Sequence, residues 1–339
     1  MKKGILVCLC LVMAVGFSMS CFAADKSYRI EVLQVTKIEP FDNAFNSFVK
    51  ALADRGLVQG KNLTIKRTII DFDIEKAGLW KKISVLMRIR SEASRIAGEK
   101  PDLVLTIGTP ATKYAKDKIT AAGIPLVFSA VAYPVAAGCK SMTEAGPGFT
   151  GATLYMDMKD ILNIIKLAFP KATTMGIIHS DDENAVAQVE EARKVGASMG
   201  LTFVTKLVGK SDRITPAAKE LAGKGVQLFV VPLDTYYALR NNEASLELYA
   251  LRRDVLHIPA IGLGTVKIPG AVLYTGSDFG YIGGLSGQQA AKILKDGVKP
   301  DTLPILRQKD LIILVDQKAY KEFNVQLPME LLRLAKPLD

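Results

Sequence analysis

The feature that most constrains the fold of this chain is a regular alternation of short apolar runs with amphipathic segments, which starts at Tyr28. The runs at 101–108 and 124–131 are almost continuously apolar, which is typical of strands buried on both faces of a parallel sheet. Between such runs, 41–56 places its apolar residues on one helical face and stops at a glycine. Strands that alternate with helices imply parallel sheets with right-handed crossovers. The sequence therefore predicts an α/β fold.

A segment rich in glycine, proline and alanine, 132–148, interrupts this alternation, which then restarts at 149. Two such runs predict two Rossmann-like lobes, each a parallel sheet flanked by helices. The 339 residues are enough for two domains of about 150 residues each. We expect the chain to cross between the lobes within 132–148, where Pro134 would fix the turn at a hinge. One long helix is expected over 235–254.

The first 24 residues have the layout of a secretory signal peptide, not of a folded element. Lys2 and Lys3 precede an apolar run at 4–17, and small residues follow it. That run is shorter than the ~20 residues that span a bilayer. We expect cleavage after Ala23 or Ala24 and a periplasmic or otherwise extracytoplasmic protein. A lipid anchor at Cys21 is the alternative.

Cysteine and charge usage exclude several classes of protein. If the signal is removed with its cysteines, only Cys139 remains of the four, so we expect no disulfide framework and no thiolate metal cluster. The formal net charge is +10, but no basic run exceeds two residues and no nucleic-acid motif is present. The sequence predicts no nucleic-acid partner, and we expect a monomer.

The sequence contains few residues or motifs that could catalyse a reaction. The chain has only two histidines, His179 and His257, and neither has a second ligand residue at metal-like spacing. A G-x-S-x-G nucleophile motif, a Walker loop and a complete dinucleotide loop are all missing. We therefore expect no catalytic residue, no metal and no cofactor. An exported hydrolase that uses one of the histidines stays open as an alternative.

Polar residues at predicted strand ends point instead to binding, because ligands of open α/β sheets lie at the carboxyl ends of the strands. Thr109 and Pro110 open a helix after a buried strand, and the N–H groups of such a helix start can bind an anion or simply be capped. Asp234 and Thr235 follow another strand, as a ligand contact or as a plain N-cap. A cleft between two lobes with such edges suits a protein that closes on a small molecule.

At this point the sequence resembles the ABC-transporter substrate-binding proteins, the group that includes tryptophan- and tyrosine-binding lipoproteins. The resemblance covers essentially the whole chain after the signal. It is carried by the order and spacing of six stretches: 48–65, "KPDLVLTIGTPATKYA", "IPLVFSAVAYPVAAG", 150–201, "LAGKGVQLFVVPLDT" and 270–297.

This resemblance implies the fold of a type I periplasmic binding protein, with two lobes joined by a hinge of crossing strands. It implies a first lobe of 25–131 with about 270–296, and a second lobe of 132–269 with about 297–339. It also implies that the protein delivers a small-molecule ligand to an ABC permease in the membrane. A second possibility keeps the fold but makes the protein a sensor that signals to a membrane kinase or cyclase.

The family's ligand-binding positions carry over residue by residue. The resemblance implies ligand contacts from the T-P-A loop, from a hydroxyl in the strand before the crossing, from an asparagine that opens a second-lobe helix, and from the aspartate-threonine pair after the V-P strand. These residues are Thr109, Pro110, Ala111, Ser129, Asn184, Asp234 and Thr235.

Two departures from the family pattern bear on the ligand. Where relatives commonly read T-D-P-V, this chain reads 132–135 as A-Y-P-V, so that Tyr133 stands in place of an aspartate facing the ligand. Where relatives often carry an acid after a late glycine, 262–264 reads G-L-G. An ammonium group would lose a carboxylate partner at each place. The sequence therefore favours a small organic ligand less cationic than a standard amino acid.

Overall fold

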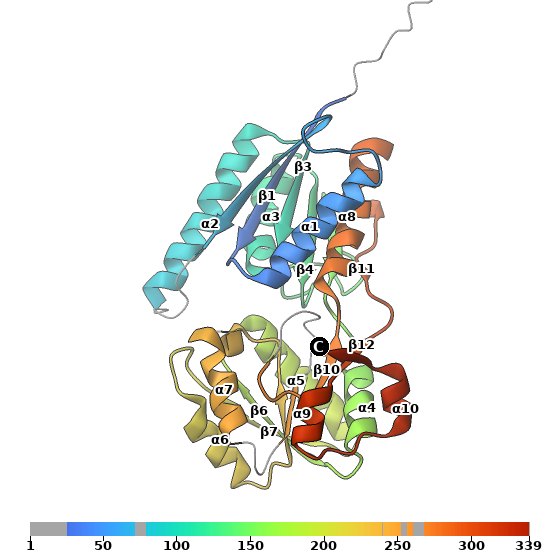
Figure 1. Cartoon of the computed structure of the whole chain (residues 1–339). Helices are drawn as coiled ribbons and strands as arrows, with labels where there is room; N and C mark the ends of the chain where they lie inside the picture. The colour runs from blue at the N-terminus through green and yellow to red at the C-terminus, as the bar shows by residue number, and fades with distance from the viewer. Residues whose placement is uncertain (1–25, 72–78, 239, 252–255, 260–267, 339) are drawn as a thin grey trace, which may run out of the picture.

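The computed structural model describes residues 26–71, 79–238, 240–251, 256–259 and 268–338. They form two α/β bodies, one above the other in Figure 1, which we call the first and the second lobe. The first lobe is built on one sheet with the strand order β11-β5-β4-β3-β1-β2, in which every neighbouring pair is parallel. Its strands are β1 (Tyr28–Val35), β2 (Leu63–Ile70), β3 (Leu103–Ile107), β4 (Leu126–Val131), β5 (Phe149–Thr153) and β11 (Leu306–Arg307).

Helices cover both faces of the first sheet. Every residue of β3, β4 and β5 is buried, as their continuous apolar character predicts. One face packs against α1 and α8, and the other packs against α2 and α3. The bounds of these helices are α1 (Glu39–Ala53), α2 (Leu79–Glu99), α3 (Thr109–Ala121) and α8 (Phe279–Asp296).

Two helices far apart in the sequence, α1 and α8, lie side by side in the first lobe (Figure 1). Their contact is unusually close because a Cβ added at Gly283 of α8 would overlap the carbonyl oxygen of Ala44 in α1. A glycine therefore lets the backbones of the two helices approach each other. This contact fixes α8 to the first lobe although it follows most of the second lobe in the sequence.

The second lobe is less regular. Its parallel sheet has the order β7-β6-β8-β9, and a second group has the order β10-β12-β13, in which β10 and β12 are antiparallel. The strands are β6 (Thr174–His179), β7 (Thr202–Leu207), β8 (Leu228–Val231), β9 (Leu256–Pro259), β10 (Leu273–Gly276), β12 (Ile312–Asp316) and β13 (Lys336–Leu338). The helices are α4 (Met158–Ala168), α5 (Glu183–Ser198), α6 (Ile214–Ala222), α7 (Glu243–Ala250), α9 (Gln317–Glu322) and α10 (Met329–Leu334).

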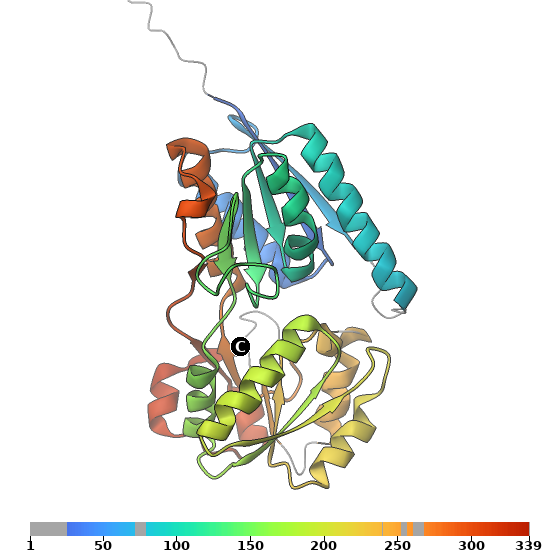
Figure 2. The same ribbon diagram turned by 180° about the vertical axis from the view of Figure 1, so that it is seen from behind.

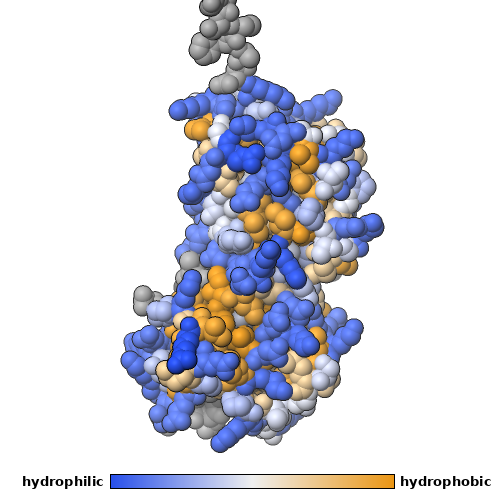
Figure 3. All heavy atoms as spheres, turned by 90° about the vertical axis from the view of Figure 1, so that its right-hand side faces the viewer, coloured by the Kyte–Doolittle hydropathy of each residue, from blue (hydrophilic) through white to orange (hydrophobic). Residues whose placement is uncertain are grey.

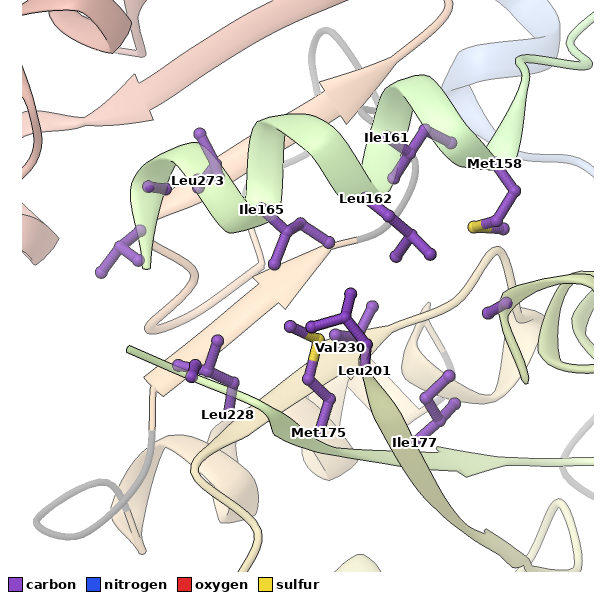
Figure 4. Packing of buried hydrophobic residues seen from close by; sticks show 14 of the residues in the cluster. Met158, Ile161, Leu162, Ile165, Met175, Ile177, Leu201, Leu228, Val230 and Leu273 are labelled. Carbon is purple, nitrogen blue, oxygen red and sulfur yellow. The ribbon is translucent and has the colours of Figure 1, made fainter. Parts of the chain in front are cut away.

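The core of the second lobe lies between its sheet and α4. Figure 4 shows Leu162 and Ile165 of α4 directed toward Met175 of β6 and Val230 of β8. These α4 residues follow the helical spacing that buries one face of an amphipathic helix. On the side of the molecule shown in Figure 3, apolar side chains gather on this lobe. Met329 and Leu334 of α10 are exposed.

Three short segments connect the lobes: 154–157 after β5, 277–278 before α8, and 308–311 between β11 and β12. Hydrogen bonds link them to one another. The Ser277 hydroxyl donates to the Leu154 carbonyl at 2.9 Å, and the Asp278 amide donates to Gln308 Oε1 at 3.0 Å. The three segments are therefore joined by hydrogen bonds and together form the hinge between the lobes.

The expected crossing within 132–148 is wrong. After β4 the chain turns, with the amides of Ala137 and Cys139 donating to the Pro134 carbonyl at 3.0 Å, and returns to the first sheet as β5. The physical reason is that Phe149–Thr153 is buried along its whole length and needs a place inside a sheet. The first sheet thus includes β5 and β11, which lie outside the ranges 25–131 and 270–296.

The expected long helix over 235–254 is also wrong. Arg240 and Asn242 have positive φ angles of 49° and 64°, which a continuing α-helix cannot contain. The segment instead forms two 3₁₀ turns, Thr235–Ala238 and Arg240–Asn242, before α7 begins. The predicted α/β class of two bodies with mostly parallel sheets flanked by helices is confirmed.

Within the ranges that the structure describes, no helix has both the length and the apolar character needed to cross a bilayer. The predicted signal peptide and Cys21 lie outside the described residues.

Candidate functional site

The first-lobe edge of the candidate site is the start of α3. Gly108, between β3 and α3, has a φ of 88°, and a Cβ added there would lie 3.0 Å from Cζ of Phe41. Both observations favour glycine at this position. Because glycine has no side chain, no side-chain hydrogen bond caps α3, so the first-turn N–H groups remain available to an anion. Thr109, Pro110 and Ala111 form that first turn.

Ser129 lies beside this helix start. It pairs in register with Ile107 of β3, and its carbonyl accepts a hydrogen bond from the Gly108 amide at 2.9 Å. The Ser129 side chain is fully buried, and its hydroxyl has no hydrogen-bond partner among the described residues. A buried unpaired hydroxyl costs about 1–3 kcal/mol. An unpaired hydroxyl next to an uncapped helix start is a favourable arrangement for a polar ligand group.

In the second lobe the polar strand ends are satisfied internally. The Asp234 carboxylate accepts hydrogen bonds from the amide and hydroxyl of Ser180, at 2.6 and 2.7 Å, and from the Tyr236 amide at 2.9 Å. Burial, with a smaller contribution from the Asp182 charge, raises the pKa of Asp234, and these hydrogen bonds oppose the rise. Asp234 therefore joins the ends of β6 and β8.

Thr235 is occupied in the same way. Its hydroxyl donates to Asp182 Oδ2 at 3.0 Å and accepts from Lys210 Nζ at 3.0 Å. Asp182 in turn caps α5 by accepting from the Asn184 amide at 3.0 Å. The second-lobe edge is thus a preformed network whose members hold one another.

The two edges meet at the N-terminus of α5. The Thr109 hydroxyl donates to Asn184 Oδ1 at 3.1 Å, and Lys113 Nζ lies 2.9 and 3.0 Å from the two carboxylate oxygens of Glu183. The Glu183 carboxylate raises the pKa of Lys113. Two residues predicted from opposite lobes, Thr109 and Asn184, are therefore in direct contact.

Tyr133 contacts the second lobe farther along α5. Its hydroxyl donates to Glu191 Oε2 at 2.9 Å, and the Tyr155 hydroxyl donates to Glu191 Oε1 at 2.6 Å. The two rings are in edge contact, with centroids 5.6 Å apart. Burial, followed by the Glu191 carboxylate, raises the pKa of both phenols, so both remain protonated donors.

The structure thus brings Thr109, Pro110, Ala111, Ser129 and Asn184 together, whereas Asp234 and Thr235 bond within their own lobe. Sequence reasoning missed Glu191, Lys113 and Phe41. A signal for Glu191 existed. Asn184 and Glu191 are spaced i, i+7 and so share one face of α5, and polar residues on one face of a helix whose other face is apolar indicate two different contacts.

Of the residues that could take part in catalysis, His179 and Cys139 are buried in the fold. Nδ1 of His179 lies 2.9 Å from the Ser180 carbonyl, and the side chain is buried. The side chain of His257 lies outside the described residues. Burial raises the pKa of the free Cys139 thiol to about 12, which removes its nucleophilic form at neutral pH. Over the described ranges, no cluster of three or more His, Cys, Asp or Glu side chains could hold a metal ion.

The chain has two α/β lobes, a hinge of three hydrogen-bonded segments, and polar strand ends that meet between the lobes. These features define a bilobal solute-binding protein. The chain belongs to the ABC transporter substrate-binding proteins, whose family model matches residues 29–338. Membership in this family makes it the extracytoplasmic, ligand-binding component of a transporter with an ABC permease.

Individual relatives agree with this assignment. A tyrosine-binding protein of Clostridioides difficile (strain R20291) is 26% identical over 307 residues, which cover 89% of this chain and 83% of the relative. Two solved structures share the fold. An L-Trp complex of an ABC domain from Streptococcus pneumonia has a TM-score of 0.77, at 20% identity over 93% of this chain and all of that one. A ligand-free, open substrate-binding protein with adhesive properties from Clostridium difficile has a TM-score of 0.72, at 24% identity over 92% of this chain and 99% of that one.

Proposed function

We propose that this protein binds a small organic carboxylate between its lobes and delivers it unchanged to the permease of an ABC importer. The observation that carries the ligand class is Ser129: its hydroxyl is buried and unpaired among the described residues, and its carbonyl accepts from the Gly108 amide just before the uncapped start of α3. Helix N-termini favour negative charge because their N–H groups lack intrahelical partners. A carboxylate there would accept from these N–H groups and from Ser129 at once.

The other half of the site is apolar. The Phe41 ring lies against Gly108 and has its centroid 6.1 Å from that of Phe279. Leu233 of the second lobe packs against the same first-lobe cluster. An apolar surface adjoining an anion-binding helix start fits an amphipathic ligand with a carboxylate at one end and an apolar or aromatic body. Tyrosine and tryptophan, the ligands named for two relatives, have that character.

The charge at Tyr133 needs a different interpretation from the one that the sequence suggested. Tyr133 replaces an aspartate, but its hydroxyl binds the Glu191 carboxylate, so a negative charge lies next to this position from the opposite lobe. We therefore retain amino acids among the candidate ligands beside less cationic acids. In this proposal Thr109, Pro110, Ala111, Ser129 and Asn184 contact the ligand, Tyr133 positions the lobes, and Asp234 and Thr235 brace the second-lobe edge.

The remaining parts of the proposal follow the sequence. We infer a monomer that binds no nucleic acid, uses no cofactor and catalyses no reaction, exported by a signal peptide over residues 1–24. Lipidation of Cys21 is the alternative fate of the N-terminus.

A thermal-shift screen tests the ligand class. L-tyrosine, L-tryptophan and 3-phenylpropionate, which lacks the amino group, are compared with tyramine, which lacks the carboxylate, and with ribose. A ligand at 100 times its Kd stabilises the folded protein by about 2.7 kcal/mol. We expect stabilisation by carboxylates with an aromatic ring and none by tyramine or ribose. Stabilisation by tyramine alone, or by none of the compounds, would contradict the proposal.

A further inference from the structure

Arg67 of the first lobe links the edge strand β2 to the start of α1. Side chains alternate between the two faces of a strand, so Gln34 lies on the same face of β1 as Val32. In the same way, Arg67 shares a face of β2 with Ile65, and this face of the sheet packs against α1. Figure 1 shows α1 in front of the sheet, and Figure 2, turned by 180°, shows it behind the sheet. Because the Arg67 side chain is only 19% exposed, neighbouring groups must satisfy its charge.

The guanidinium of Arg67 binds groups of both β1 and α1. Nε and Nη2 donate to Gln34 Oε1 at 3.2 and 2.5 Å, and Nη2 also donates to Asp42 Oδ1 at 2.6 Å. The Cζ atom lies 4.2 Å from the centroid of the Phe45 ring, which is a cation–π contact. Gln34 belongs to β1, whereas Asp42 and Phe45 belong to α1. A planar, forked cation stacks on a ring and donates to two oxygens at once, so lysine is not an equivalent residue here.

Gln34 extends the effect of Arg67 to the turn between β1 and α1. Its side chain is fully buried, and Nε2 donates to the Thr36 carbonyl at 2.7 Å. Thr36 has a φ of 72°, a left-handed conformation that a β-branched residue adopts only where its surroundings impose it. Helix α1 begins three residues later at Glu39, and in the described part of the chain no side-chain hydrogen bond caps it. The start of α1 therefore depends on the contacts that Arg67 and Gln34 make.

The start of α1 in turn places the Phe41 ring. Phe41 lies in the first turn of α1, next to Asp42 in the sequence. Its ring lies against Gly108, with its centroid 6.1 Å from that of Phe279. Gly108 directly precedes the helix start to which we assign the ligand carboxylate. The distance between the carboxylate site and the aromatic wall is thus fixed by the segment that Arg67 holds.

We propose that Arg67 is a positioning residue that sets the preference of the site for ligands with an aromatic body. Arg67 acts through Phe41 and does not itself contact the ligand. Without Arg67 the start of α3 still accepts a carboxylate, but the ring of Phe41 no longer has a fixed place beside it. This inference rests on the proposed function for its ligand, whereas the placement of Phe41 concerns the first lobe alone.

Calorimetric titration with two carboxylates that differ only by a phenyl ring, 3-phenylpropionate and propionate, tests the inference. Arg67→Met keeps an apolar stem beside Phe45 and removes the donors. We expect its affinity for 3-phenylpropionate to fall about tenfold, for the loss of one aromatic contact, and its affinity for propionate to stay unchanged. Arg67→Lys keeps the charge beside Asp42 without the fork, and should lie between wild type and Arg67→Met. Equal losses for both ligands, or no loss for 3-phenylpropionate, would overturn the proposal.

Hydrogen exchange without ligand separates this outcome from that of the proposed function. The Thr36 amide donates to the Ile70 carbonyl at 3.0 Å. The Phe41 amide donates to the Ile38 carbonyl at 3.1 Å. Exchange at both amides should be about tenfold faster in Arg67→Met, because the turn opens more often. Unchanged exchange would refute the placement of Phe41 by Arg67, even if no carboxylate binds.

Arg95 offers a matched control on the opposite face of the same sheet. It belongs to α2 and donates to Glu31, a buried carboxylate of β1, at 2.8 Å. Arg95→Met therefore also removes an arginine that joins β1 to a helix, and we expect it to lose stability. Because this contact lies away from α1, the ratio of the two affinities and the exchange at Phe41 should match wild type. A change of ratio as large as that in Arg67→Met would indicate general loosening of the first lobe and would overturn the proposal.

Discussion

The two lobes share an α/β plan but treat their polar strand ends in opposite ways. The first lobe has six parallel strands in one sheet and leaves the Ser129 hydroxyl unpaired next to an uncapped helix. The second lobe mixes parallel and antiparallel pairs, yet its Asp234 accepts three hydrogen bonds within the lobe. Unpaired polar groups bind a ligand at low cost, because they have no internal partner to lose. In the function that we propose, the first lobe therefore supplies the recognition groups, and the second lobe supplies a preformed surface that closes on them.

The largest expected difference between the lobes concerns packing. Gly283→Ala in the first lobe places a methyl group against the Ala44 carbonyl, which is helix backbone and cannot move away, so we expect a loss of about 3 kcal/mol in the free energy of unfolding. Gly196→Ala in the second lobe meets side chains and no backbone: the Phe203 ring, which must shift, and Leu201 Cβ at ordinary contact distance. Both changes gain about 1 kcal/mol of helix propensity, so the second should be close to neutral.

Urea denaturation of the two alanine variants measures this contrast. Equal losses in both would mean that α5 is held as rigidly against its strand as α8 is against α1. No loss in Gly283→Ala would show that α1 and α8 can separate, and would remove the argument that α8 is fixed to the first lobe.

The sequence predicted the first lobe better than the second for a physical reason. The almost continuously apolar run predicted at 124–131 contains β4, Leu126–Val131, because a strand buried on both faces needs no partner information to be recognised. The crossing could not be located in this way. Phe149–Thr153 has the same buried character in either sheet, and its pairing with β4 is a long-range contact. The left-handed residues that break the expected helix at 240–242 are likewise set by tertiary context, since neither is a glycine.

The same limit applies to the site. The start of α3 was predictable because a strand, a glycine and Thr109-Pro110 are local signals. The role of Glu191 depends on Tyr133, which is 58 residues away and on the other side of the interface. Asp234 is paired within its own lobe because Ser180, 54 residues away in the sequence, donates hydrogen bonds to it. Local chemistry thus predicted which residues are polar strand ends, and only the packed structure shows which of them are already paired.

The next largest effect tells whether the Ser129 hydroxyl at the first-lobe edge binds the ligand or only stabilises the fold. Ser129→Ala removes a buried hydroxyl without a described partner, so we expect the ligand-free protein to gain about 1 kcal/mol in free energy of unfolding. Affinity for whichever carboxylate the screen identifies should fall about tenfold, since a hydrogen bond to a charged group is lost. Thr150→Val is the matched control. Its hydroxyl is also buried but donates to the Leu303 carbonyl at 3.0 Å, so this variant should lose stability and keep its affinity. Calorimetric titration measures the affinity of both variants, and urea denaturation measures their stability. Reduced stability with unchanged affinity in Ser129→Ala would mean that this hydroxyl has a structural role.

The smallest effect concerns the pH dependence of the second-lobe brace. Burial raises the pKa of Asp234, so the folded protein holds this proton more tightly than the unfolded chain. Above the ordinary aspartate pKa of about 4, the folded state therefore binds more protons than the unfolded state, and the free energy of unfolding falls as the pH rises through the interval up to the raised pKa. Asp234→Asn cannot titrate and should lack this fall, whatever stability it loses from altered hydrogen bonding to Ser180. Unfolding by urea at half-unit steps from pH 4 to pH 7 gives the difference between wild type and variant. A difference that grows in favour of wild type with rising pH would mean that the donors from Ser180 and Tyr236 outweigh burial, and that the second-lobe brace prefers its charged form.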